Sequence, residues 1–140
     1  MVDLQLIDYL SQFISERRMA LLDSVLSFRT RYLTVVLEDI YQPQNASAVL
    51  RTCECLGIQD VHIIENQHKY YYSQGVAMGA GKWTNLIKYN TPHSDTNTRR
   101  AINALRENNY RIVATMPGKN CISLNDFNVL DGKVAIVFGS

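Results

Sequence analysis

The chain has 140 residues, of which 46% are hydrophobic and 19% charged, and a formal net charge of +1 at pH 7. Its size predicts a single folded unit, and its charge excludes RNA binding through a bulk positive field, so any RNA contact must come from local patches. The start, MVDLQLIDYLSQF, has acids where a secretory signal has a basic flank, and no apolar run is long enough to span a membrane. These features predict a cytoplasmic protein with no membrane partner.

The first predicted elements are helices. Residues 3–28 show helical periodicity, and Ser15 has the character of an N-cap that divides them into two helices. An apolar strand follows around residues 33–37. A third helix is predicted over NASAVLRTCECLG (residues 45–57), with Asn45 as its N-cap. Its expected buried face consists of Ala46, Val49, Cys53 and Leu56.

The rest of the chain alternates between strands and helices. Strands are predicted for DVHIIE, NLIKY, YRIVAT and KVAIVFG, a helix for residues 95–108, and a loop for PGKNCISLNDFN. Strands rich in valine and isoleucine and separated by helices predict an α/β fold with a parallel sheet covered on both faces. Ligands of such sheets bind beyond the carboxyl ends of the strands. The candidate site segments are therefore QPQNASAVLR, TMPGKN and FGS.

Arg51 is a charged residue in the middle of the third predicted helix. At 100° per residue it lies about 200° around the helix from Val49, which places it away from the expected buried face and on the side of Ser47 and Glu54. Spacing alone favours a solvated arginine with a weak surface partner at Glu54.

Cysteine and histidine spacing predicts neither a disulfide framework nor a metal site. The residues concerned are Cys53, Cys55, Cys121, His62, His68 and His93. They contain no CxxC pair and match no metal-ligand spacing.

Two further stretches have candidate RNA-binding residues. GVAMGAGKW departs from a phosphate-binding loop, because Trp83 follows Lys82 where serine or threonine is required. We predict a loop on the RNA side, with Lys82 as a phosphate contact. QHKYYYSQ is able to stack bases and touch phosphates, and its alternative role is a loop whose tyrosines cover the edge of the core.

Three segments resemble a known family. NASAVLRTCECLGI resembles the first motif of the SpoU branch of the SPOUT RNA methyltransferases, in which an asparagine opens the helix and an arginine follows six residues later. VAIVFGS resembles the beginning of the second motif, where a hydrophobic strand ends in a glycine at the cofactor site. ISERRMALLDSVLSFRTRYLTVVLEDIYQPQN is similar to the run-in of the TrmH group. The resemblance covers residues 14–140.

The resemblance implies a fold and a reaction. The fold is a Rossmann-like SPOUT domain at residues 32–140, with a helical extension at residues 1–31. The reaction is methyl transfer from S-adenosylmethionine to a ribose 2′-hydroxyl, on a guanosine in the D loop of tRNA or, alternatively, on ribosomal RNA. The family arginine, here Arg51, activates that hydroxyl. Because a guanidinium stays protonated, we predict that Arg51 stabilises the developing alkoxide or grips an adjacent phosphate.

The resemblance also assigns the other site residues. Asn45 and Ser47, at the helix start, are expected to bind RNA, although Asn45 as a simple cap is the structural alternative. Thr115, Met116 and Gly139 are expected to border the cofactor. For Gly139 the alternative is an ordinary glycine at a strand end.

The family pattern continues beyond the last residue, Ser140, into a third motif and a trefoil knot. We therefore expect a truncated form with little activity, whose parent protein is a homodimer. Two other classes stay open. One is a non-catalytic RNA-binding or interaction module. The other is a different nucleotide-binding α/β enzyme, against which the lack of a glycine fingerprint argues.

Overall fold

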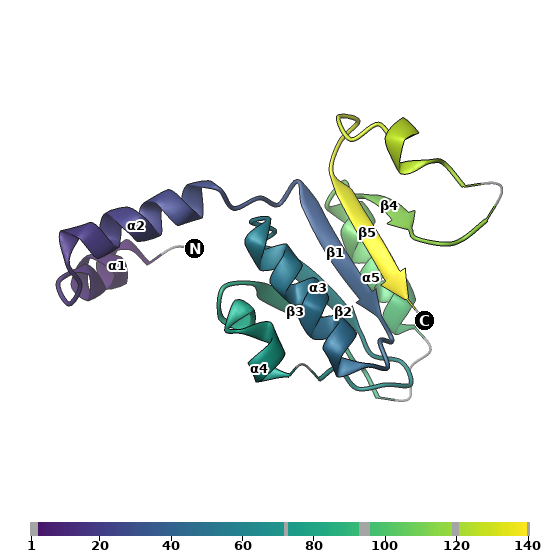
Figure 1. The fold of residues 1–140 in the computed structure, drawn as a ribbon, viewed down its shortest axis with the longest axis horizontal. Helices are drawn as coiled ribbons and strands as arrows, with labels where there is room; N and C mark the ends of the chain where they lie inside the picture. Colours follow the sequence, from purple (N-terminus) through teal and green to yellow (C-terminus); the bar gives the residue numbers. More distant parts are fainter. Residues whose placement is uncertain (1–2, 72, 93–95, 119–120, 140) are drawn as a thin grey trace.

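A two-helix arm leads into an α/β body (Figure 1). The computed structural model describes residues 3–71, 73–92, 96–118 and 121–139. The N-terminal arm (residues 3–28) contains helices α1 (Leu4–Ser11) and α2 (Glu16–Ser27). Ser15 caps α2 by accepting a hydrogen bond from the backbone N–H of Arg18 at 3.3 Å. This confirms the predicted division into two helices.

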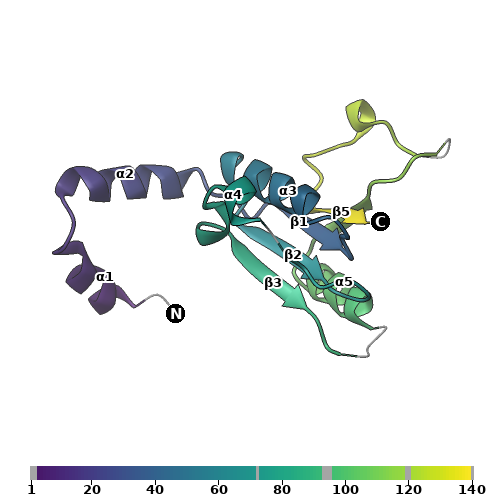
Figure 2. The ribbon, with the colours of Figure 1, turned by 60° about the horizontal axis from the view of Figure 1, so that its bottom comes forward.

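Five parallel strands form one sheet in the order β3-β2-β1-β5-β4 (Figure 2). The strands are β1 (Leu33–Glu38), β2 (Asp60–Ile64), β3 (Asn85–Tyr89), β4 (Arg111–Ala114) and β5 (Val134–Gly139). On the central strand, Val35 pairs with Val61 on one side and with Ile136 on the other. The predicted parallel α/β fold is confirmed, strand by strand.

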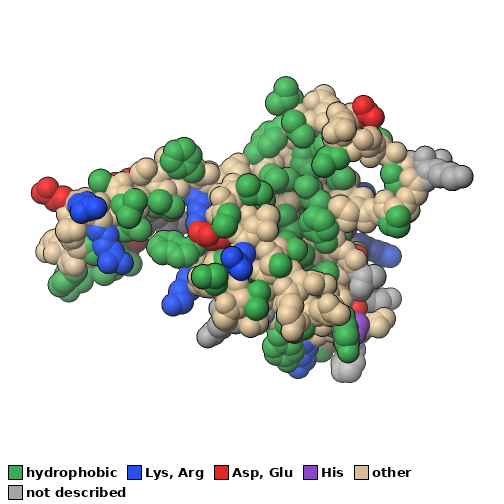
Figure 3. All heavy atoms as spheres, viewed as in Figure 1, with side chains coloured by type: hydrophobic (Ala, Val, Ile, Leu, Met, Phe, Trp, Pro, Cys, Tyr) green, Lys and Arg blue, Asp and Glu red, His purple; other side chains and the backbone are tan. Residues whose placement is uncertain are grey.

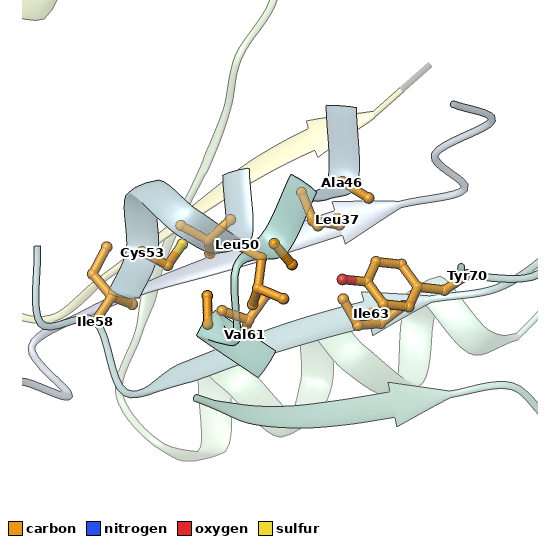
Figure 4. Packing of buried hydrophobic residues seen from close by; sticks show 11 residues of the cluster. Leu37, Ala46, Leu50, Cys53, Ile58, Val61, Ile63 and Tyr70 are labelled. Atoms are coloured by element: carbon orange, nitrogen blue, oxygen red, sulfur yellow. The ribbon is translucent and has the colours of Figure 1, made fainter. Parts of the chain in front are cut away.

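Helices lie on both faces of the sheet, as predicted (Figure 2). Helices α3 (Pro43–Cys55) and α4 (Gln74–Ala77) cover one face, and α5 (Asn97–Glu107) covers the other. The predicted start of α5, Asp95, lies outside the described residues. Successive side chains of β1 point to opposite faces, so that Leu37 packs under α3 and Val36 under α5. Figure 4 shows the α3 side, where Leu50 lies over Val61.

Helix α3 begins earlier than predicted. Gln42 is its N-cap and Pro43 its first residue, so Asn45 lies inside the first turn and the predicted cap is wrong. Proline fits this position because its fixed φ suits a first turn whose N–H needs no helical partner. The buried face is also rotated from the prediction. It comprises Ala46, Ser47, Leu50 and Cys53, whereas Val49 is half-buried and Leu56 is exposed.

Helix α3 is followed by Gly57, which contacts the end of the N-terminal arm. The N–H groups of Gly57 and Ile58 donate to the carbonyls of Glu54 and Cys53, at 3.1 and 2.8 Å, which is the Schellman pattern. Gly57 has φ +72°, and a Cβ there would meet the carbonyl oxygen of Phe28 at 2.4 Å. The N–H of Thr30 also donates to the Gly57 carbonyl at 2.8 Å. Only glycine fits this contact between arm and body.

Two stretches predicted as loops contain short helices. The glycine-rich stretch forms α4 and a 3-10 helix, Ala80–Lys82, because small residues such as Ala77 and Ala80 pack into the core beneath α3. The segment before β5 contains a 3-10 helix at Leu124–Asp126. Within the described ranges, no helix is long and apolar enough to cross a membrane.

Candidate active site at the carboxyl edge of the sheet

The three predicted cofactor residues lie together at the carboxyl edge. Thr115 follows β4, and its N–H and hydroxyl both donate to the carbonyl of Val137, each at 3.0 Å. Gly139 ends β5, opposite Glu38 at the end of β1. Met116, next to Thr115, is 66% exposed. The edge therefore offers exposed backbone and an apolar side chain in one place.

No close contact among the described residues requires glycine at position 139. A Cβ at this position would meet Glu38 Oε2 at 3.5 Å, an ordinary van der Waals distance, and its φ is not positive. The glycine thus leaves open backbone at the strand end without relieving a clash. The two interpretations of Gly139 from the sequence both remain predictions.

Two linked hydrogen bonds hold the Glu38 side chain at this edge. The hydroxyl of Thr98, in the first turn of α5, donates to Glu38 Oε1 at 2.6 Å. The side-chain amide of Asn66 donates to the Thr98 hydroxyl at 3.0 Å. Sequence reasoning missed this carboxylate, because its partners come from segments about 30 and 60 residues away, and no local pattern brings them together.

Asp39 shapes the loop after β2. It has φ +53°, a left-handed conformation that aspartate adopts more readily than most residues. Its Oδ1 accepts the backbone N–H groups of Asn66, Gln67 and His68 at 3.1, 2.8 and 2.8 Å. Burial raises the pKa of Asp39, but these hydrogen bonds outweigh it and hold the pKa below its usual value. The carboxylate therefore orders a loop at the edge of the site.

Asp39→Ala is expected to lower the free energy of unfolding by about 2–3 kcal/mol, because three backbone donors lose a charged acceptor. Asp39→Asn keeps an acceptor and should lose less. Since the folded-state pKa of Asp39 is below the unfolded value of about 3.9, its charge stabilises the fold above that pH, and this contribution disappears as the pH falls through the folded-state pKa. Urea unfolding between pH 7 and pH 3 tests this. An Asp39→Asn variant with the same acid sensitivity as the wild type contradicts it.

The tyrosine-rich stretch divides between core and surface. Tyr70 is buried beneath α3, whereas Tyr71 is 63% exposed, and Tyr72 lies outside the described residues. The His68 ring meets the exposed ring of Tyr41 edge to face, with centroids 5.1 Å apart. The interpretation that tyrosines of this stretch cover the core is confirmed for Tyr70, and RNA binding by the stretch stays a prediction.

Arg51 lies on the exposed side of α3. This side is formed by Gln44, Asn45, Ala48, Arg51 and Cys55. Among the described residues, no hydrogen bond or ion pair involves the Arg51 side chain. The predicted partner, Glu54, instead binds Arg29 at 3.1 Å, so that pairing is wrong. Arg51 lies about 9 Å along the helix axis from Asn45. Its guanidinium is available to a ligand.

Ser47 does not share the surface of Arg51. It is fully buried, its hydroxyl donates to the Pro43 carbonyl at 2.6 Å, and its Oγ accepts the N–H of Ser73 at 2.9 Å. The predicted exposure of Ser47 is wrong, because α3 is rotated about its axis relative to the predicted face. Ser47 thus ties the first turn of α3 to the start of α4, while Asn45 stays exposed.

Lys82 is exposed, but the structure does not bring it to the carboxyl edge. It ends the 3-10 helix just before β3 and so lies near the amino ends of the strands. The other predicted RNA residue that is exposed, Asn45, stands where α3 begins, beyond the carboxyl end of β1. An RNA contact at Lys82 therefore belongs to a different part of the surface.

The sequence of the chain matches one family of known proteins. The model of the SpoU rRNA methylase family matches residues 32–140. A tRNA (guanosine(18)-2′-O)-methyltransferase of Borreliella burgdorferi is 43% identical over 137 residues, covering 98% of this chain and 60% of the relative. The Thermus thermophilus protein of the same name is 29% identical, covering 90% of this chain and 61% of the relative.

Solved structures agree with the fold. A TrmH/SpoU tRNA-modifying enzyme of A. aeolicus superimposes with a TM-score of 0.74 at 23% identity, covering 89% of this chain and 60% of that structure. The SpoU methyltransferase AviRb of Streptomyces viridochromogenes, in complex with AdoMet, superimposes with a TM-score of 0.61 at 16% identity, covering 81% of this chain and 45% of that structure. The chain spans about 60% of the length of the relatives named first.

Proposed function

Because the chain belongs to the SpoU rRNA methylase family, we propose that it forms part of an enzyme that methylates a ribose 2′-hydroxyl of RNA with S-adenosylmethionine. The substrate we favour is a guanosine of tRNA, since the two similar relatives named above are tRNA (guanosine(18)-2′-O)-methyltransferases. The D loop as the target comes from the sequence resemblance. Ribosomal RNA is the alternative substrate.

The observation that supports this function is the exposed guanidinium of Arg51, which has no hydrogen-bond or ion-pair partner among the described residues and lies on a helix that begins at the carboxyl edge. An arginine fork is able to donate two hydrogen bonds to a phosphate, or to a ribose oxygen that gains negative charge. Because a guanidinium has only donors, Arg51 stabilises the alkoxide and orients the ribose, while the hydroxyl proton passes to solvent water. The exposed amide of Asn45, at the start of the same helix, adds a hydrogen bond to RNA.

The residues at the carboxyl edge fit one side of the cofactor. Met116 provides apolar surface, and Thr115 and Gly139 are exposed beside it at the ends of β4 and β5. The Glu38 carboxylate, next to Gly139, complements a cationic ligand. When bound, S-adenosylmethionine supplies an electrophilic methyl group. We assign Thr115, Met116 and Gly139 to holding it.

Glu38→Gln is expected to raise the Kd for S-adenosylmethionine about fivefold, because a partly exposed charge pair is worth about 1 kcal/mol. Glutamine retains an acceptor for the Thr98 hydroxyl, so the fold should be unaffected. Glu107→Gln, at the far end of α5, is the matched control. Isothermal titration calorimetry measures both, and an unchanged Kd for Glu38→Gln contradicts the assignment.

We propose further that residues 1–31 are a helical extension of a methyltransferase domain at residues 32–140, and that the whole protein works in the cytoplasm as a homodimer. Residues 1–140 alone are expected to turn over slowly, because the edge that we assign to the cofactor is exposed at Met116 and Gly139. The non-catalytic RNA-binding module remains the alternative.

Titration of S-adenosylmethionine into the 140-residue chain tests the proposal. The same titration is made into a chimera, in which the chain replaces the 137 residues that it matches in the Borreliella burgdorferi relative. We expect the chimera to bind the cofactor and the short chain to bind it more weakly. If neither binds the cofactor while both bind tRNA, the RNA-binding module is the better account.

A further inference from the structure

A groove separates helix α2 from the body of the protein. It has a volume of about 940 Å³, toward the upper end of the range of about 300–1,000 Å³ that is usual for ligand pockets. One wall is a side of α2, and the body contributes Gln59, Lys82, Trp83 and Asn85. Gln59 precedes β2 and Asn85 begins β3, so the groove lies at the amino ends of the strands. It is therefore separate from the carboxyl edge that we assign to the cofactor.

The lining of the groove is positively charged. Its charged residues are four cations and one carboxylate, namely Arg17, Arg18, Arg29, Lys82 and Glu54. The acidic residues of α2, Glu16 and Asp23, are not among the lining residues, so the helix presents its arginines to the groove and its carboxylates elsewhere. In Figure 3, lysine and arginine side chains lie on the arm and where the arm meets the body. An excess of cations in a concave site attracts a polyanion.

Arg29 is a buried cation in this lining. Only 8% of its side chain is exposed, and its Nη2 donates to Glu54 Oε1 at 3.1 Å, whereas its Nη1 has no hydrogen-bond partner among the described residues. A buried donor without an acceptor is unfavourable, and a phosphate oxygen supplies a strong acceptor for a guanidinium. Because α2 has no buried residue, a shift of this helix that admits an anion to Nη1 breaks little packing.

Trp83 adds an aromatic surface to the same groove. Its residue is 52% exposed, although its backbone is fixed: its N–H donates to the carbonyl of Ala80 and its carbonyl accepts the side-chain amide of Gln59, each at 3.1 Å. The ring therefore projects from an ordered turn. Any base is able to stack on such a ring, because every base has a π face. Cations beside an exposed aromatic ring are the combination with which proteins hold an unpaired nucleotide.

The groove adjoins the helix that carries Arg51. Glu54 lines the groove and follows Arg51 by three residues, a spacing that makes two side chains neighbours on a helix surface. We propose that this groove, hereafter the arm groove, binds an unpaired nucleotide of the RNA whose ribose reaches Arg51. The base stacks on Trp83, and phosphates of the strand meet Arg29 and Lys82. This inference rests on the proposed RNA substrate but not on the methyl transfer itself.

A protein segment is the less suitable occupant of the arm groove. The apolar side chains of Leu21, Val25 and Leu26 would suit either occupant. An apolar peptide would leave the cations of the lining without an anion, whereas a nucleotide packs its base and sugar against apolar groups and brings its own phosphate. The nucleotide therefore uses both features of the lining.

Titration of a tRNA transcript into the 140-residue chain tests the stacking on Trp83, which is the only tryptophan of the chain. We expect saturating tRNA to quench its fluorescence. Trp83→Ala should raise the Kd for labelled tRNA about tenfold, the loss typical of one stacked base, and Trp83→Phe should restore most of the affinity. Tyr9→Ala, at an exposed aromatic residue of α1 outside the groove, is the matched control with an expected wild-type Kd. Undiminished fluorescence at saturation, or a wild-type Kd for Trp83→Ala, overturns the proposal.

Lys82→Gln tests the phosphate contact. It should weaken tRNA binding and lower the slope of log Kd against log salt concentration by about one, whereas Trp83→Ala should leave that slope unchanged. Arg99→Gln removes the charge of an exposed arginine on α5, across the sheet from α3, and is the matched control with an expected wild-type slope. Equal slopes for Lys82→Gln and the wild type contradict the proposal.

The outcomes separate the arm groove from the proposed function. In the chimera, Trp83→Ala should raise KM for tRNA and leave kcat unchanged, as when binding common to the ground and transition states is lost. Methylation and tRNA binding that do not depend on Trp83 or Lys82 overturn the arm groove alone. A wild-type chain that binds no RNA overturns both proposals. If Trp83→Ala changes the mass of the chain in sedimentation equilibrium but not its Kd for tRNA, the groove serves a protein partner and the proposal is wrong.

Discussion

Arg51→Ala is expected to lower kcat for RNA methylation about 10²–10³-fold, the loss typical of removing one donor that stabilises a developing oxyanion. The reaction is followed in the chimera with the Borreliella burgdorferi relative, using radiolabelled S-adenosylmethionine and a tRNA transcript. The Arg51 side chain is exposed and has no hydrogen-bond or ion-pair partner among the described residues, so the free energy of unfolding should stay within about 0.5 kcal/mol of the wild type. A loss of rate without a loss of stability separates chemistry from folding.

Arg51→Lys distinguishes the effect of the planar guanidinium donors from the effect of the positive charge. Lysine keeps the positive charge but loses the planar pair of donors, so most of the rate should remain lost. Arg106→Ala, an exposed arginine in the last turn of α5, is the matched control and should leave kcat unchanged. Wild-type turnover in the lysine variant refutes the bidentate part of the role, and wild-type turnover in the alanine variant refutes the role itself.

Gly57→Ala is expected to destabilise the fold by about 3 kcal/mol or more. The new Cβ would stand 2.4 Å from the backbone oxygen of Phe28, which cannot rotate away, and the residue has φ +72°. Gly132→Ala is the matched control, because Gly132 has φ +92° but open space around its Cβ position. It should cost about 1 kcal/mol, from the left-handed conformation alone. Urea unfolding of both variants gives the difference.

Equal losses for the two glycine variants contradict the close contact between the arm linker and the end of α3. A smaller loss at Gly57 than at Gly132 contradicts it more strongly. The difference also reports on how the arm is attached, because the Phe28 to Thr30 segment connects α2 to the body at this point.

The sequence predicted the sheet well because its strands are short apolar runs separated by helical periodicity. KVAIVFG and DVHIIE are recognisable without any tertiary information, and their order with the helices implies parallel pairing. The start of α3 was misplaced because Asn45 is a strong local N-cap candidate, while Pro43 fits the first turn at least as well. Capping propensity alone does not decide between two adjacent starts.

The candidate site was only partly predictable. The exposure of Arg51 follows from helical spacing, and the shared edge of Thr115 and Gly139 follows from parallel topology. The burial of Ser47 depends on Ser73, and the role of Asp39 depends on three N–H groups in a loop about 27 residues away. Such contacts are set by the packing of distant segments, so no local pattern in the chain identifies them.

The most direct test of the ribose methylation account is the identity of the product. The chimera is incubated with S-adenosylmethionine and a tRNA transcript, and the digested nucleosides are analysed by mass spectrometry. The account predicts 2′-O-methylguanosine, and predicts none when the target guanosine is replaced by its 2′-deoxy form. Methylation of a base, or no methylated nucleoside from a chimera that binds both cofactor and tRNA, would contradict it.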